Sequence, residues 1–152
     1  GLESVTYDEA LEVALCYGWI DGQKKSLDSE WWLQKFTRRG PKSQWSKVNT
    51  EKAQKLIEEG KMKPAGLQAV EHARQDGRWA VAYAPQSAAV VPDDLQAALA
   101  GNPEALAFFA TLDSRNRYAI LYRIHSARRP ETRARRIEQL VTMLADHRRL
   151  YP

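Results

Sequence analysis

The sequence predicts an α+β fold that is mostly helical, with a small aromatic β-hairpin near the N-terminus and a C-terminal helical bundle. Three observations lead to this prediction. Apolar residues recur at helical spacing over most of the 152 residues. Between Trp19 and Thr37 that period is replaced by aromatic and β-branched residues, which favour strands. After Pro92 the amphipathic segments are short, and they can bury their apolar stripes only against each other.

The first helix is predicted from its two ends. Thr6 followed three residues later by Glu9 is a capping box, and Gly18 is a typical helix stop. Two strands are expected next, Ile20–Lys25 and Trp31–Thr37, on either side of a polar turn. A two-stranded hairpin is marginal alone, so it must pack on helices or join further strands.

The tryptophans of this region are expected to stabilise the fold. Four of the chain's five tryptophans lie between residues 15 and 49, interleaved with Lys and Arg. We predict that Trp19 and at least one of Trp31 and Trp32 are mostly buried, because the helix and the turn on either side must pack together.

Helices should make up the remainder of the chain. The next helix is expected to have Asn49 as its N-cap and to end at Gly60, and a third opens at Pro64 and ends near Gly77. Residues 85–92 have no clear period and are predicted to connect an N-terminal α+β lobe (1–84) to a C-terminal helical lobe (93–152). Four helices are expected in the second lobe: Asp93–Ala100, one opened by Asn102-Pro103, one capped by Ser114, and one opened by Pro130.

Positive charge is concentrated in the last quarter of the chain. From Ser114 onward there are ten Arg and three acidic residues, a net charge of +7, whereas the whole chain carries only +4. Arg129, Arg133 and Arg136 lie at i, i+4 and i+7, as on a helix that follows a phosphate backbone. No helix-turn-helix pattern accompanies them, so the prediction is weak nucleic-acid binding without sequence preference, set against a solvated basic helix face.

The second candidate site is the loop around Gly40-Pro41. Cations and an aromatic ring gather there and could bind a phosphate or carboxylate while the ring stacks on the ligand; the alternative is a solvated loop whose Trp45 fills the core. Asp21 could form a turn, pair with Arg38 or Arg39, or act as a polar anchor beside Trp19. The candidate ligand-binding residues are Trp19, Asp21, Arg38, Arg39, Lys42, Trp45 and Lys47.

No catalytic or metal-binding motif was found in the sequence. The three histidines lack ligand spacing, and no GxSxG, GxGxxG or Walker-type loop is present. We therefore expect no cofactor and no metal. Cys16, the single cysteine, lies in an apolar helix pattern and is expected to be a buried structural residue in a cytoplasmic protein. No apolar run is long enough to predict a membrane span.

Four segments together resemble one bacterial family. They are EALEVALCYGWIDGQ, FTRRGPKSQWSKVN, LIEEGKMKPAGLQAVEHARQDGRW and NRYAILYRIHSARRPETRARRIEQLVTML. These segments are similar to the YdeI/OmpD-associated family, also labelled bacteriocin-protection proteins, from about Thr6 to Leu144. The resemblance implies a cytoplasmic bacterial protein linked to stress or antimicrobial resistance, with further N-terminal sequence ahead of the first helix. It does not imply a mechanism. The prediction is thus a non-enzymatic binding protein for a small anionic or aromatic ligand or a protein partner.

Overall fold

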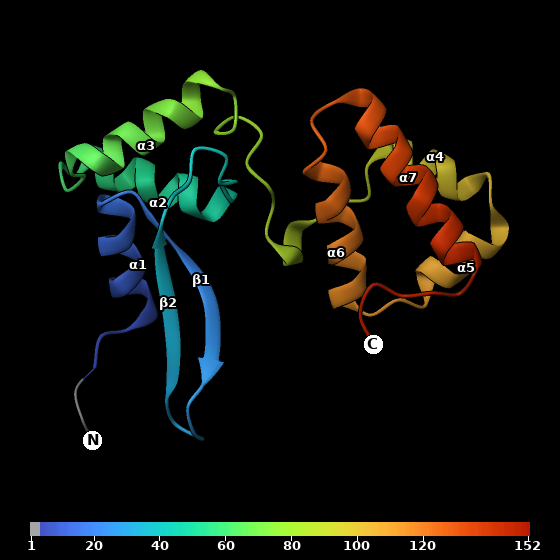
Figure 1. Ribbon diagram of the computed structural model, residues 1–152, viewed down its shortest axis with the longest axis horizontal. Coiled ribbons are helices and arrows are strands. Elements are labelled where there is room, and N and C mark those ends of the chain that lie inside the picture. Colours follow the sequence, from blue (N-terminus) through green and yellow to red (C-terminus); the bar gives the residue numbers. More distant parts are fainter. Residues whose placement is uncertain (1–3) are drawn as a thin grey trace. The chain divides into compact units, whose positions relative to one another are not determined.

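The structure, a computed structural model, describes residues 4–152 and divides the chain into two compact units, Gly1–Tyr83 and Ala84–Pro152. Each unit has its own hydrophobic core. The fold is mostly helical with one antiparallel two-stranded hairpin, as the sequence predicts (Figure 1). Strands expected ahead of Gly1 lie outside the described residues.

The first unit is three helices and the hairpin. Its elements are α1 (Tyr7–Cys16), β1 (Trp19–Ser26), β2 (Trp32–Arg38), α2 (Lys47–Glu58) and α3 (Pro64–Gln75). The capping box of Thr6 and Glu9 is present, and Gly18 ends the helix with a φ of +75°. Helix α1 packs against β1, α2 and α3, and Leu11 and Leu15 are the centre of this contact because both are almost fully buried.

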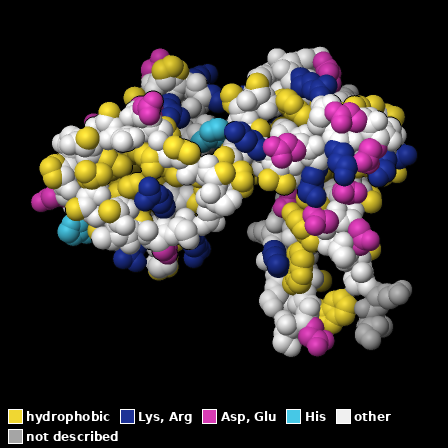
Figure 2. Space-filling view, turned by 180° about the vertical axis from the view of Figure 1, so that it is seen from behind, with side chains coloured by type: hydrophobic (Ala, Val, Ile, Leu, Met, Phe, Trp, Pro, Cys, Tyr) yellow, Lys and Arg dark blue, Asp and Glu magenta, His cyan; other side chains and the backbone are white. Residues whose placement is uncertain are grey.

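Pairing in the hairpin runs from Trp19 opposite Arg38 to Ser26 opposite Trp32, with an irregularity between Asp21 and Lys24. The prediction that its tryptophans are mostly buried is wrong. Trp19 is 42 % exposed, and Trp31 and Trp32 are each 37 % exposed. A sheet of two strands has no second layer to cover it, so these rings are shielded only by neighbours such as Lys24, whose Nζ lies 3.8 Å from the centroid of the Trp32 ring. Figure 2 shows hydrophobic side chains at the surface along the projecting hairpin.

The start of α2 also differs from the prediction. Ser46 is the N-cap, and its hydroxyl accepts a hydrogen bond from the backbone N–H of Asn49, the residue expected to be the cap. The chain before α2 is fixed by backbone hydrogen bonds in which Tyr83 N–H donates to Trp45 O (3.0 Å) and Lys47 N–H donates to Tyr83 O (2.9 Å). This bridge is a long-range contact, so it starts the helix earlier than local capping rules suggest.

The second unit is a helical bundle preceded by a short 3₁₀ turn, Gln86–Ala88, inside the segment expected to be extended. Helices α4, α5 and α6 all pack against α7 around buried leucines and isoleucines. One predicted cap is shifted: Asp113, rather than Ser114, caps α6. The helices are α4 (Asp93–Ala100), α5 (Pro103–Ala110), α6 (Ser114–His125) and α7 (Pro130–Ala145).

Candidate functional site

A pocket of about 340 Å³ lies in the first unit, between the loop after β2, the end of α1 and one side of α3. Three arginines and a histidine line it, and none of the described residues lining it carries a carboxylate. A pocket with this lining is positively charged and suits an anionic ligand. The lining residues are Tyr17, Gly18, Arg38, Arg39, Gly40, Pro41, Trp45, Ala65, Gln68, Ala69, His72 and Arg78.

The guanidinium of Arg39 lies flat over Trp45, with Cζ 3.5 Å from the ring centroid. Its Nη1 donates to the backbone carbonyl of Gln44 at 3.0 Å. Nε and Nη2 of the same group are buried and have no hydrogen-bond partner among the described residues. Burial lowers the pKa of Arg39 to about 10, because the charged form is the one that loses water.

Trp45 is 2 % exposed, so it belongs to the core, as one of the two sequence interpretations expected. Arg39 covers its ring, and Trp79 packs against it with the two ring centroids 5.0 Å apart. Its indole Nε1–H is buried without a hydrogen-bond partner. A tryptophan packed in this way has no free face on which a ligand ring could stack.

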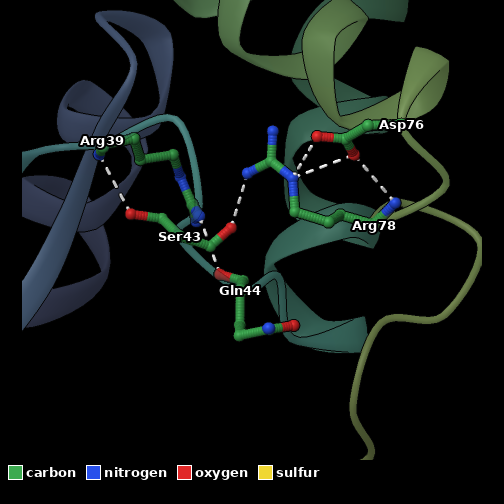
Figure 3. Close-up of polar contacts among 6 residues, drawn as sticks. Arg39, Ser43, Gln44, Asp76 and Arg78 are labelled. Carbon is green, nitrogen blue, oxygen red and sulfur yellow. Dashed lines mark hydrogen bonds and ion pairs between the residues drawn. The ribbon is translucent and has the colours of Figure 1, made fainter. Parts of the chain in front are cut away.

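Arg78 is the second buried guanidinium of the pocket, at 6 % exposure. Its Nε lies between the two carboxylate oxygens of Asp76, at 2.9 and 2.7 Å, and its Nη1 donates to the carbonyl oxygen of Ser43 at 2.7 Å (Figure 3). The hydroxyl of Ser43 accepts from the backbone N–H of Gly40 at 3.0 Å. Residues 40–44 are thus held by both arginines, Arg39 at Gln44 and Arg78 at Ser43.

Unpaired buried donors are concentrated in this pocket. Among residues 4–152, the buried side-chain nitrogen and oxygen atoms without a partner are Arg39 Nε, Arg39 Nη2 and Trp45 Nε1. Buried polar groups are nearly always hydrogen-bonded in folded proteins, because leaving one unpaired costs about 1–3 kcal/mol. All three atoms are donors, so the group that would satisfy them is an acceptor.

The structure brings three of the seven predicted ligand-binding residues to this pocket: Arg38, Arg39 and Trp45. The other four, Trp19, Asp21, Lys42 and Lys47, are not among its lining residues. Lys42 is exposed on the loop, and Lys47 is the first residue of α2.

Asp21 is not paired with arginine. No ion pair joins it to Arg38 or Arg39 within the described chain; it accepts a hydrogen bond from the Tyr7 hydroxyl at 3.0 Å. Burial and then this hydrogen bond raise the pKa of Tyr7 to about 12. The carboxylate therefore links β1 to α1, because α1 lies nearer to this part of the hairpin than either guanidinium.

Sequence reasoning missed four polar residues of the pocket, which are Tyr17, Gln68, His72 and Arg78. For Arg78 a signal was present: Gly77 turns the chain, which places Asp76 and Arg78 within reach of each other, and Trp79 follows. Gln68 and His72 lie one turn apart on α3, and only the tertiary packing of that helix shows which of its residues face the loop.

The arginines proposed for nucleic-acid binding lie at the start of α7. Arg129 is its N-cap residue. Arg133 donates to both carboxylate oxygens of Asp94 and, through Nη1, to the carbonyl of Ile124 at 3.0 Å. Arg136 donates to the Ser126 hydroxyl at 2.8 Å and to the Arg123 carbonyl. Two of the three guanidiniums are thus engaged within the unit itself.

Two further features bear on the chemistry. Cys16 is 8 % exposed, and burial raises the pKa of its thiol. Within the described part of the chain, no three His, Cys, Asp or Glu side chains are grouped so that they could hold a metal ion. Nor does any helix among residues 4–152 have the length and apolar character needed to cross a membrane.

Comparison with known proteins assigns the two halves of the chain to different families. Residues 1–69 match a family described as Domain of unknown function (DUF8412). Residues 88–147 match the family described as Bacteriocin-protection, YdeI or OmpD-Associated. No curated protein and no solved structure matches the chain. The family predicted from the sequence motifs is confirmed, although its match covers the second unit rather than nearly the whole chain. Through residues 88–147, the chain belongs to the Bacteriocin-protection, YdeI or OmpD-Associated family.

Proposed function

We propose that the first unit binds a small anion in the pocket lined by Arg38, Arg39 and Arg78. The observation that carries this proposal is the set of unpaired buried donors, all of which belong to two residues of one pocket. A protein keeps such a costly arrangement where it serves a purpose, and a bound acceptor would supply the missing hydrogen bonds.

The charge of the lining supports an anion over a neutral aromatic ligand. Three guanidiniums and no carboxylate line the pocket among the described residues, and Asp76 lies behind Arg78 as its partner. Hydrogen bonds from buried guanidinium to an anion are stronger than those made in water. The packing of Trp45 removes the ring face that an aromatic ligand would need.

Nuclear magnetic resonance of the ¹⁵N-labelled protein tests the proposal. Sodium acetate and sodium phosphate are titrated at constant ionic strength, with chloride as the reference anion. We expect at least one of them to shift the indole N–H signal of Trp45 in a saturable way, because that donor gains an acceptor.

Arg39→Met should abolish the saturable shift, whereas Lys42→Met, on the same loop but outside the pocket, should leave it unchanged. A shift that is equal for chloride, or that survives in Arg39→Met, would contradict anion binding at this site.

Nucleic-acid binding through Arg129, Arg133 and Arg136 is the second candidate, supported by the net charge of +7 after Ser114. It has less support, because Arg133 and Arg136 donate within their own unit. Full use of three phosphate contacts would give a log–log salt slope of roughly −2.7 on duplex DNA. A measured slope near zero would exclude this role.

A cellular role in stress or antimicrobial resistance rests on the description of the family alone. Growth of a strain lacking the gene in the presence of bacteriocins tests it. The cytoplasm is the proposed compartment, since the single cysteine cannot form a disulfide within the chain.

A further inference from the structure

We infer that the ligand of this pocket is a monocarboxylate, held by the edge of the Arg39 guanidinium that carries Nε and Nη2. The inference deepens the proposed function and depends on it, because it names the class of anion.

The geometry of Arg39 supports a planar, two-oxygen acceptor. A guanidinium can bind two oxygens side by side through its Nη1 and Nη2 end or through its Nε and Nη2 edge. The first is taken, because Nη1 donates to Gln44 O, whereas both nitrogens of the second have no partner among the described residues. Two parallel N–H groups on one edge match the two oxygens of a carboxylate.

Charge balance supports an anion of charge −1. Arg78 is neutralised by Asp76, which meets its Nε with both oxygens. Arg39 has no carboxylate among its hydrogen-bond and ion-pair partners in the described chain. Arg38 is exposed and keeps its hydration. One buried charge is therefore unmatched, and a carboxylate neutralises it, whereas a phosphate group carries closer to two charges at neutral pH.

The remaining lining determines the size of the ligand. Pro41, Ala65, Ala69 and the ring of Tyr17 form an apolar wall beside the arginines. The volume of about 340 Å³ is at the small end for ligand pockets, which run from about 300 to 1,000 Å³. The ligand expected is thus a carboxylate on a short apolar body, either a free acid or the C-terminus of a peptide.

The test uses the whole chain and five probes, followed by the Trp45 indole signal and by calorimetry. Propionate stands for a free acid, and N-acetyl-L-alanine stands for a peptide C-terminus. N-acetyl-L-alanine amide has the same body without the charge, and methylphosphonate and inorganic phosphate supply tetrahedral anions. We expect propionate or N-acetyl-L-alanine to bind at least tenfold more tightly than the amide and both tetrahedral anions. The tighter of the two carboxylates identifies the source.

Arg39→Lys separates the edge from the charge. A lysine keeps the positive charge but offers no pair of parallel N–H groups, so carboxylate affinity should fall at least tenfold. Lys42→Arg is the matched control and should bind as the unchanged protein does.

The outcomes distinguish the two proposals. Tighter binding of phosphate or methylphosphonate than of either carboxylate overturns the monocarboxylate and leaves anion binding standing. Full carboxylate affinity in Arg39→Lys also overturns the inference. If none of the four anions binds, the proposed function itself is wrong, and the inference falls with it.

Discussion

At the scale of the residue, Arg39 carries a charge that the fold does not neutralise. Its guanidinium rests on Trp45 and makes one hydrogen bond to the backbone, with no carboxylate partner in the described chain. Removing a charged group from water is expensive, and the lowered pKa of Arg39 reports that cost. The same position is favourable once an anion is bound, so the residue is best explained by the ligand rather than by stability.

Arg39→Met is therefore expected to stabilise the protein without ligand. A methionine of similar length can lie on Trp45 without a desolvation cost, and this gain should outweigh the lost hydrogen bond to Gln44. We expect the free energy of unfolding to rise by about 1 kcal/mol, by the reasoning that applies to apolar replacement of buried ionic groups. Urea denaturation measures it, with Lys42→Met as the control, and a loss of stability would show that Arg39 has a structural role.

At the scale of the element, the closest approach in the first unit is between α1 and α3. Gly66 has no side chain, and a Cβ there would overlap the backbone carbonyl oxygen of Cys16. The contact brings the C-terminal end of α1 against the start of α3, and the pocket lies where these two segments meet the loop after β2. The spacing of α1 and α3 therefore fixes the shape of the pocket.

Gly66→Ala should destabilise the first unit even though alanine is the better helix former. The gain in helix propensity is about 1 kcal/mol, whereas overpacking a tight contact costs about 1–3 kcal/mol and here requires backbone movement. Gly101→Ala is the control, because its added Cβ would meet only ordinary contacts from 3.5 Å, and its φ of −75° suits alanine. Thermal unfolding of the two variants compares them, and equal melting temperatures would refute the tight contact.

Helices α4 and α7 are joined by the ion pair of Asp94 and Arg133. Hydrogen bonding from Arg133 holds the pKa of Asp94 below its ordinary value of 3.8. A carboxylate whose pKa is lowered in the folded state contributes stability above the unfolded pKa, and that contribution is lost as the pH falls through the folded pKa.

Asp94→Asn should accordingly lower stability at pH 5 and have little effect at the most acidic pH at which the protein remains folded. The carboxylate side chain is 45 % exposed, so the difference at pH 5 should be below about 1 kcal/mol. Urea denaturation at the two pH values measures it, with Asp93→Asn, the neighbouring acid of the same helix turn, as the control. A destabilisation that is independent of pH would show that the ion pair is not its cause.

Sequence periodicity predicted the helices well because each has its own start and stop signals, such as Thr6 with Glu9 and Asn102 with Pro103. The exposure of Trp19 was not predictable, since it depends on the number of strands in the sheet and not on the residue. The site was predicted by half for a similar reason. Arg38, Arg39 and Trp45 are on one loop, but Arg78 and His72 reach it only through the packing of α3.

At the scale of the whole molecule, the chain is two units with separate cores, and the family boundaries fall near the same place. The units are Gly1–Tyr83 and Ala84–Pro152, and the two family matches cover residues 1–69 and 88–147. Because neither core borrows buried residues from the other, each half should carry the information for its own fold.

Fragments 1–83 and 84–152 are expected to fold when produced separately. Each should show helical circular dichroism and a cooperative thermal transition, since the hydrophobic core of each remains complete. A cut between residues 100 and 101 is the control, because it separates α4 from α5 and divides the second core. Fragments that are unfolded alone and fold only on mixing would show that the two units depend on each other.

The burial of Cys16 makes the chain convenient for spectroscopy. Its thiol is covered and its pKa is raised, so little thiolate is present at neutral pH to react with maleimides. It is also the only cysteine of the sequence. Cysteines introduced at exposed positions, one in each unit, would therefore take fluorescent dyes selectively without replacement of Cys16. Energy transfer between the two dyes would then report the distance between the units in solution, and its change when an anion binds.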